Sequence, residues 1–300
     1  NALIVLSSIG GSTNGLVHLT AMAGRLGITI DLIKFDEITK NLPMIVDLKP
    51  SGTGYMEDLY KAGGSQRIFY ELRDFLYLDA KSVNGTTLGE EIKNSAKWTQ
   101  NIITNKSNPV FNAGSIAVLK GTLAPNSAII KQSAATESLL IHEGRAVVFE
   151  GLEDLANRID RDDLDVTKDD VLVLKSIGPK GGPGMPEAGL IPIPKKLAKQ
   201  GVKDMVRISD GRMSGTASGT IILHVTPESY ENGPLAIVQN GDLIKLDVPK
   251  RKIDLMISEE EIAERLLKRK KVNMRRRGYN KIYMEHVTQA DRGVDFDFLI

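Results

Sequence analysis

Between residues 113 and 257 the sequence consists of short apolar runs separated by glycine, proline, asparagine and aspartate, and this pattern narrows the possible folds more than any other feature. Short runs rich in β-branched residues and bounded by turn residues are typical of buried strands. So many short strands at this spacing predict a barrel or a compact β-rich domain. The predicted strands are 115–119, 127–131, 145–149, 171–174, 205–209, 220–225, 235–238 and 243–246.

The flanking parts of the chain have a different texture. Residues 1–108 read as helices with short connections, together with one predicted strand at 43–48. Ser12 or Thr13 suits the N-cap of the first long helix. The other helices are predicted at 36–41, 55–62, 67–78 and 88–95, and two more interrupt the strand-rich region at 152–159 and 194–200.

A third segment begins at Ser258. Ser258 and Glu261 have the spacing of a capping box, which predicts a helix from there to about residue 271. The predicted fold is therefore of the α/β class. It comprises the end of an α/β N-terminal domain (1–108), a β-barrel-like domain (109–257) and a C-terminal helix with a tail (258–300).

Composition excludes several kinds of protein. The formal net charge is +1, so no global field favours nucleic acid or a membrane surface. No apolar run approaches the roughly 18 residues of a membrane span. The chain has no cysteine and four widely spaced histidines, which argues against disulfides and a zinc site within it. We take the cytoplasm as the default compartment. The start at Asn1, inside an apolar run and without a signal-peptide pattern, suggests the later part of a longer protein.

Eight basic residues lie between Arg265 and Arg277. Such a run could bind nucleic acid, or it could be the solvated face of a helix. We favour the solvated face, because no aromatic residues interleave with the charges and the rest of the chain balances them. This basic helix and the apolar tail 296–300 could serve packing between subunits.

The segment from Asp210 to Gly219 places three glycines and three hydroxyl residues between two predicted strands. Glycine lets backbone N–H groups approach a ligand closely, because it has no Cβ. Ser214 and Thr216 are therefore candidate reactive or binding hydroxyls. A solvated connection with ordinary turn chemistry is the alternative.

A second glycine-rich segment runs from Ile177 to Glu187. Its prolines exclude a helix, and it lacks the Gly-Lys-Ser/Thr ending of a phosphate-binding loop. Glu187 on such a rigid loop is a plausible ligand for a hard cation, although a lone glutamate is more often a solvated surface residue.

Four strings together resemble one enzyme family. They are GGSTN at 10–14, GTLAPN at 121–126, GPKGGPGMPE at 178–187 and SDGRMSGTASG at 209–219. In order and spacing they are similar to the dihydroxy-acid dehydratase and phosphogluconate dehydratase family, and the resemblance covers essentially the whole chain. The sugar-acid branch, the arabinonate and xylonate dehydratases, is most similar. The strings that carry this are PMIVDLKPSG at 43–52, the run 191–210, LHVTPES at 223–229 and the run 283–299.

The resemblance implies a hydro-lyase that dehydrates an aldonic acid to a 2-keto-3-deoxy acid, with Mg²⁺ and an iron–sulfur cluster, of the [2Fe-2S] type, as Lewis acids. It further implies that Glu187 binds Mg²⁺, that Ser214 removes the C2 proton and that Thr216 binds substrate. Asn14 could contact the substrate carboxylate at a helix N-terminus or simply cap the helix, and Ser51 has the same two interpretations.

In that family the cluster cysteines, the other magnesium ligands and a modified lysine lie upstream of GGSTN, outside this chain. The resemblance also implies a catalytic cleft between domains and a homodimer or homotetramer. Two other functions stay open: a dihydroxy-acid dehydratase of branched-chain amino acid synthesis, and a noncatalytic module that binds sugar acids.

Overall fold

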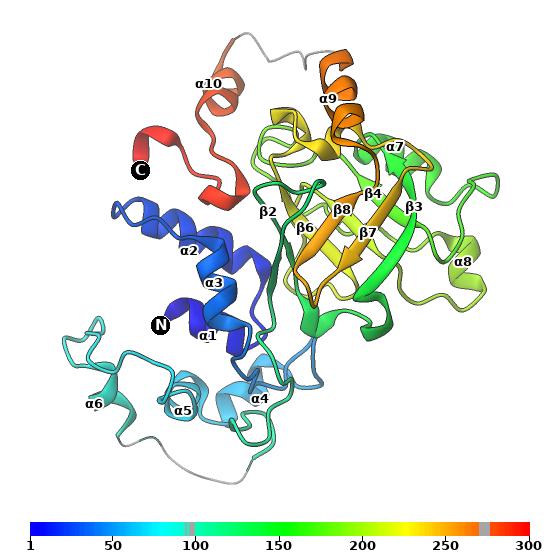
Figure 1. The fold of residues 1–300 in the computed structure, drawn as a ribbon. Helices are drawn as coiled ribbons and strands as arrows, with labels where there is room; N and C mark the ends of the chain where they lie inside the picture. The colour runs from blue at the N-terminus through cyan, green and yellow to red at the C-terminus, as the bar shows by residue number, and fades with distance from the viewer. Residues whose placement is uncertain (94, 96–99, 270–276) are drawn as a thin grey trace.

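The computed structural model describes residues 1–93, 95, 100–269 and 277–300. A helical N-terminal part lies beside a mixed sheet of eight strands that is rolled into a nearly closed barrel, and the C-terminal helices flank both (Figure 1). The predicted α/β class with a barrel-like C-terminal part is confirmed. Among the described residues, no helix has the length and apolar character needed to cross a bilayer.

Local capping explains where the N-terminal helices begin. The Ser12 hydroxyl accepts the backbone N–H of Asn14 at 3.2 Å, so Ser12 rather than Thr13 is the N-cap. Asp31 caps the next helix in the same way, which therefore begins before the predicted residue 36. The helices of this part are α1 (Ala2–Ser8), α2 (Thr13–Gly24), α3 (Leu32–Thr39), α4 (Met56–Lys61), α5 (Gly64–Glu71) and α6 (Leu88–Ile92).

The strands form one sheet in the order β1-β2-β6-β5-β4-β3-β7-β8. The pairs β3–β4, β4–β5 and β5–β6 are parallel, and the other pairs are antiparallel. The two edges meet where Lys120, just after β1, pairs with Lys252 at the start of β8. This pairing brings the barrel close to full closure. The strands are β1 (Ala117–Leu119), β2 (Ser127–Ile130), β3 (Ile141–Phe149), β4 (Val171–Leu174), β5 (Arg207–Ser209), β6 (Ile221–Thr226), β7 (Leu243–Asp247) and β8 (Lys252–Leu255).

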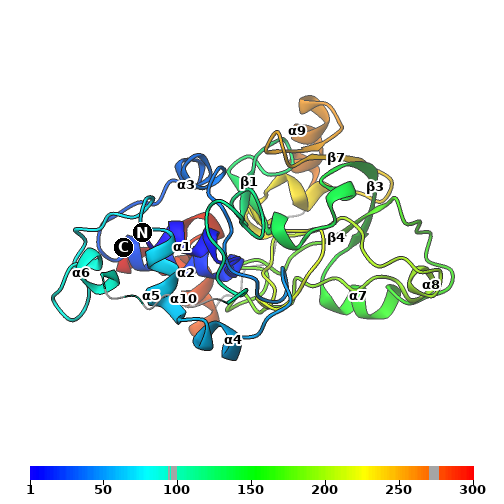
Figure 2. The same cartoon turned by 90° about the horizontal axis from the view of Figure 1, so that it is seen from below.

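Side chains on the two faces of the sheet enter different cores, as the two-residue period of a strand requires. Val173, Ile208 and Ile222 point into the barrel interior. Leu172 and Leu174 of the same strand β4 point outward, into a core that α7 (Leu152–Arg158) and α8 (Lys195–Lys199) cover. Seen from below, these two helices lie at the opposite end of the molecule from α5 and α6 (Figure 2).

Two predicted strands are wrong. Residues 43–48 form only isolated bridges, because Met44, Val46 and Leu48 pair with three different segments instead of one neighbouring strand. Residues 235–238 lie largely in a 3₁₀ helix (Pro234–Ile237). Pro234 fixes the φ of its first turn, and a short buried apolar run has no periodicity that separates helix from strand.

The C-terminal segment contains α9 (Glu259–Lys268) and α10 (Tyr279–His286). Ser258 accepts the N–H of Glu261 at 3.1 Å, which is the first half of the predicted capping box; the structure does not show the reciprocal bond. The helix ends at Lys268, before the predicted residue 271. The remainder of the basic run, residues 270–276, lies outside the described residues.

A buried ion pair joins the helical part to the barrel. Arg251 donates from Nε to both carboxylate oxygens of Asp36, at 2.9 Å each, and the N–H of Val118 donates to the same carboxylate at 3.1 Å. Asp36 lies on α3, whereas Val118 lies on β1 and Arg251 just before β8. The carboxylate therefore anchors α3 at the barrel's closing seam.

Replacing Asp36 by alanine should lower the free energy of unfolding of the full-length protein by about 2 kcal/mol, as measured by denaturant titration. The value falls below the roughly 3–5 kcal/mol of a fully buried pair, because the Arg251 side chain keeps 24% exposure. Glu57→Ala removes an exposed partner of Lys61 and should change stability by less than about 0.5 kcal/mol. Equal effects of the two substitutions would contradict the anchoring role of Asp36.

Candidate active site

The two glycine-rich loops leave the barrel side by side. The loop of residues 178–189, here the Glu187 loop, follows β4, and the loop of residues 210–219, the Ser214 loop, follows β5. Because β4 and β5 are parallel neighbours, both loops emerge at the carboxyl edge of the sheet, where ligands bind in many α/β proteins. The strand order therefore brings the two glycine-rich loops together, which composition alone does not show.

Asp210 ties the strand ends together. Its carboxylate accepts the backbone N–H groups of Ser176 at 3.2 Å, Ile177 at 3.0 Å and Ser229 at 2.9 Å. These donors follow β4 and β6, so one side chain joins the ends of three adjacent strands. Complete burial raises the pKa of Asp210, while the three N–H groups oppose that rise.

Glu228 supports the Glu187 loop from beneath. Its carboxylate accepts the N–H groups of Lys180 at 2.9 Å and Gly181 at 3.0 Å, and the Gln289 side chain donates to it at 2.7 Å. Burial raises its pKa to about 7, partly offset by these hydrogen bonds. Gln289 belongs to the C-terminal segment, so this carboxyl also connects the tail to the loop.

The N-terminus of α2 meets both loops. The Asn14 amide donates from Nδ2 to Glu187 Oε1 at 2.6 Å and to the Met213 carbonyl at 3.0 Å. Gly215 lies against Ser12, since a Cβ on Gly215 would lie 3.0 Å from Ser12 Cβ. Three of the predicted site segments are therefore in direct contact, although Asn14 and Met213 are 199 residues apart.

Ser214 and Thr216 lie together on the Ser214 loop. Their hydroxyl oxygens are 3.0 Å apart, and the N–H of Thr216 donates to Ser214 Oγ at 3.4 Å. Thr216 is exposed and Ser214 half-buried. Within the described residues, no histidine or carboxylate hydrogen-bonds Ser214, so the chain does not build a hydrolase triad around it.

Ser51 lies on the adjoining loop. Its hydroxyl is 3.0 Å from that of Ser133, and it lies beside Gly10, whose Cβ would be 3.8 Å away. In the described part of the chain it forms no hydrogen bond with Asn14 or Ser214. Ser51 therefore borders the site without joining its central contacts.

The site offers hard oxygen ligands for a magnesium ion. Glu187 is exposed, and the Asn14 Oδ1 atom is buried without a hydrogen-bond partner. Oxygen pairs of this kind fit Mg²⁺. The described residues contain no group of three or more His, Cys, Asp or Glu residues that could hold a metal, so further ligands must come from water or from outside these residues. An iron–sulfur cluster does not fit this chain alone, since it has no thiolate.

A pocket of about 640 Å³ lies against both loops. It is bounded by α2, the two loops and the C-terminal segment, through residues that include Val17, Met22, Met185, Arg212 and Val294. Its size falls within the range of small-molecule sites. The pocket therefore gives a ligand room between α2 and the two loops, although Asn14, Glu187 and Ser214 are not among its lining residues.

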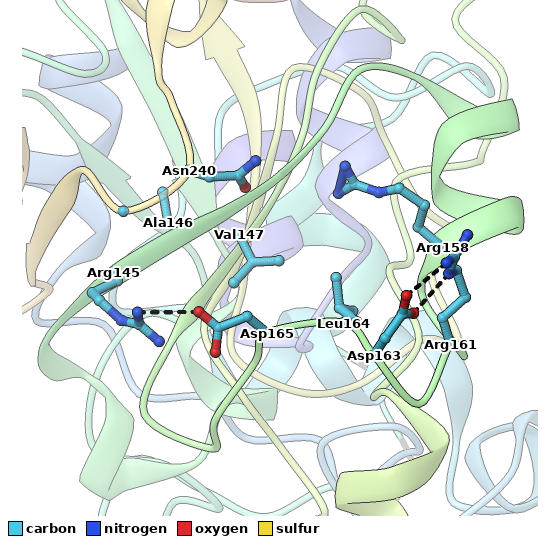
Figure 3. A pocket seen from close by; sticks show the side chains of 10 residues that line it. Arg145, Ala146, Val147, Arg158, Arg161, Asp163, Leu164, Asp165 and Asn240 are labelled. Atoms are coloured by element: carbon cyan, nitrogen blue, oxygen red, sulfur yellow. Dashed lines mark hydrogen bonds and ion pairs between the residues drawn. The ribbon is translucent and has the colours of Figure 1, made fainter.

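A second pocket, of about 340 Å³, lies near α7. Its lining includes Arg145, Arg158, Arg161, Asp163, Asp165 and Asn240. Figure 3 shows Arg145 directed at Asp165 and Arg161 paired with Asp163. Arg145 also pairs with Asp170, and Arg158 donates to the Val148 carbonyl. Aspartates thus pair with Arg145 and Arg161, and Asp154 lies 3.3 Å from Arg158 Nε. These carboxylates offset the positive charge that the pocket could offer to an anionic substrate.

Family models match most of the chain. The dihydroxy-acid/6-phosphogluconate dehydratase C-terminal model covers residues 101–294, and the N-terminal model of the same name covers residues 1–91. The chain belongs to this dehydratase family.

Individual relatives agree with that assignment. A putative dehydratase, IlvD1, of Rhizobium meliloti is 48% identical over the whole chain, and an L-arabinonate dehydratase of Rhizobium leguminosarum bv. trifolii is 45% identical. A dihydroxy-acid dehydratase of Methanococcoides burtonii is 40% identical over 98% of the chain. The chain spans about half the length of these curated relatives, covering 52–53% of each.

Two residues of this candidate site were not singled out individually in the sequence. Asp210 directly follows a predicted strand and Glu228 lies in the string LHVTPES, but neither position indicates a role under the loops, because the partners of Glu228 are 48 and 61 residues away. Both act on the backbone of the loops, and backbone partners leave no residue-type pattern in a sequence.

The raised pKa of Glu228 predicts a pH-dependent stability. In the unfolded chain the Glu228 carboxyl ionises at its ordinary pKa of 4.5. In the folded protein it stays protonated until the pH reaches its raised pKa of about 7. The full-length protein should therefore lose stability, on the order of 3 kcal/mol, as pH rises through that window. Glu228→Gln should flatten this slope in thermal or denaturant unfolding at several pH values. The matched change Glu231→Gln, at a more exposed carboxyl paired with Lys180, should leave the pH dependence of stability unchanged. If Glu228→Gln also leaves this pH dependence unchanged, Glu228 is not its source.

Proposed function

We propose that the protein containing this chain is a hydro-lyase that removes water from an aldonic acid and releases a 2-keto-3-deoxy acid. The Asn14 amide carries this proposal, because it joins the candidate metal ligand Glu187 to the backbone of the Ser214 loop. A base and a cation site next to each other are what removal of a proton beside a carboxylate requires. The relative named as an L-arabinonate dehydratase supports the sugar-acid class.

In this mechanism Ser214 Oγ takes the C2 proton of the substrate and the C3–O bond breaks. The departing hydroxide leaves as water once Ser214 has passed that proton to it, which restores the alkoxide. The enol then moves its hydroxyl proton to C3 and becomes the 2-keto acid. A neutral serine is a weak base, so Ser214 must act as an alkoxide. Thr216 hydrogen-bonds Ser214 and holds its oxygen in place. Asn14 orients Glu187 and, with Ser51 at the border, contacts the substrate.

Glu187 and Asn14 Oδ1 would hold Mg²⁺, which supplies positive charge where the enolate oxygen develops. The iron–sulfur cluster expected from the family would rest on cysteines outside this chain. We further propose a cytoplasmic homodimer or homotetramer acting on a small sugar acid, with no role for nucleic acid or membrane.

Ser214→Ala in the full-length protein should lower kcat for aldonate dehydration by roughly 10²- to 10⁴-fold, the usual contribution of a general base. Glu187→Gln should raise the Mg²⁺ concentration needed for half-maximal rate. Ser218→Ala, a neighbouring exposed hydroxyl of the same loop, serves as the matched control and should keep near wild-type turnover. Near-normal turnover in Ser214→Ala would show that another group is the base.

A substrate panel separates the three candidate functions. The full-length protein should turn over at least one C5 or C6 aldonate with higher kcat/KM than 2,3-dihydroxyisovalerate. The opposite preference would make it a dihydroxy-acid dehydratase of branched-chain amino acid synthesis, as the Methanococcoides relative is named. Binding of aldonates without turnover, after Mg²⁺ and cluster loading, would make it a noncatalytic module.

A further inference from the structure

A closed ring of loops surrounds the N-terminus of α2. On one side, Gly215 of the Ser214 loop lies against Ser12, the N-cap of α2. The next contact runs from Gly10, two residues earlier, to Ser51. These contacts place Ser51 on the same rim as the Ser214 loop.

The other side of the ring is formed by the segment after β2. The Ser133 hydroxyl is 3.0 Å from that of Ser51, and the N–H of Gly219 donates to the Ala134 carbonyl at 2.9 Å. Since Gly219 ends the Ser214 loop, the ring closes there. Residues 131–134 therefore border the proposed active site directly.

Lys131 lies between strand β2 and the ring residues Ser133 and Ala134. Two residues before it, Ile129 of β2 packs against Leu16 and Phe35 of the helical part. The two-residue alternation of β2 gives Lys131 the side of Ile129, which faces α2, before the chain enters the 3₁₀ helix Gln132–Ala134. Lys131 keeps only 4% exposure, and no hydrogen bond or ion pair joins its ammonium to any described residue.

The segments bonded to Ser133, two residues after Lys131, carry unsatisfied polar groups. The hydroxyls of Ser7, Ser8 and Ser115 are buried without hydrogen-bond partners. Ser115 lies between the other two segments, because its N–H donates to the Ser7 carbonyl at 3.2 Å and its own carbonyl accepts the N–H of Ser133 at 3.3 Å. Buried polar groups without partners cost free energy, and a ligand that pairs with them recovers it.

The local field favours an anion. The first turn of α2, a helix of 12 residues, presents backbone N–H groups and contains no acidic side chain of its own, and Glu187 meets it only through the Asn14 side chain. The ammonium of Lys131, which has no anionic partner among the described residues, adds positive charge to that of the helix N-terminus. Burial lowers the Lys131 pKa to about 8, because the charged form is desolvated. A negatively charged group between the two would satisfy both.

We propose that Lys131 and the first turn of α2 bind the carboxylate of the substrate. The choice of ligand rests on the proposed function, in which the substrate is a sugar acid with one carboxylate. The carboxylate pairs with the Lys131 ammonium, and the reacting carbons extend from there toward Ser214 and Glu187. Lys131 is thus a specificity residue for acids over the corresponding neutral sugars.

Lys175 provides a matched control for a purely structural role. It is also buried, at 3% exposure, but its ammonium pairs with Glu150 at 2.9 Å and with the Ala236 carbonyl at 3.2 Å. It also lines a different pocket, between α9 and the barrel. Lys175→Met should therefore lower the melting temperature and leave KM unchanged.

The experiment uses the full-length protein. Lys131→Met should raise KM for the aldonate roughly 10- to 100-fold, as expected for a lost charge-assisted hydrogen bond, with a smaller change in kcat. Titration calorimetry compares the Ser214→Ala variant with the double variant Ser214→Ala/Lys131→Met. The single variant should bind the aldonate with a lower Kd than its uncharged amide, and the double variant should bind the two with similar Kd. The melting temperature of Lys131→Met should not fall, because an unpaired buried charge is removed.

The outcomes separate the two proposals. An aldonate dehydratase whose KM and amide discrimination survive Lys131→Met overturns the carboxylate site and leaves the proposed function intact. A protein that dehydrates no aldonate, yet binds 2,3-dihydroxyisovalerate in a Lys131-dependent way, overturns the function and keeps the site. A lower melting temperature in Lys131→Met with unchanged binding would assign Lys131 to the fold alone.

Discussion

The architecture of the site depends on one buried carboxylate. Asp210 accepts three backbone N–H groups that follow β4 and β6, and it begins the loop that follows β5. Burying a carboxylate is costly unless hydrogen bonds compensate, and here two bonds fix the backbone after β4 and the third fixes the backbone after β6. The positions of both glycine-rich loops follow from it, because each starts within a few residues of these contacts.

Glycine is needed where the loops approach other backbone. A Cβ on Gly178 would lie 2.7 Å from the Glu228 carboxylate, and one on Gly219, whose φ is +117°, would lie 2.0 Å from the Arg207 guanidinium. Any side chain there would push a loop off its support. The glycines that first marked these segments therefore serve close packing beneath the loops as well as access above them.

Much of this could be predicted from the sequence, for identifiable reasons. The Ser12 cap and most of the strands follow from local patterns, and the specific strings SDGRMSGTASG and GPKGGPGMPE indicate the family. The run 235–238 could not be placed, since Pro234 and tertiary burial decided it. That Glu187 and Ser214 share a site depends on β4 and β5 being parallel neighbours, which is a property of sheet order and not of either segment. Lys131 gave no signal, because its isolation is visible only once its neighbours are known.

The Asn14 amide contacts Glu187 and Met213, which lie 173 and 199 positions further along the chain. Contacts so distant along the chain carry a large loop-closure entropy and form late in folding. Partly folded states of the protein therefore have no binding site, even when the barrel's local hairpins are in place. Any ligand that occupies the site binds only the completed fold and stabilises it by mass action. The concentration of such a ligand would then act on the lifetime of the protein.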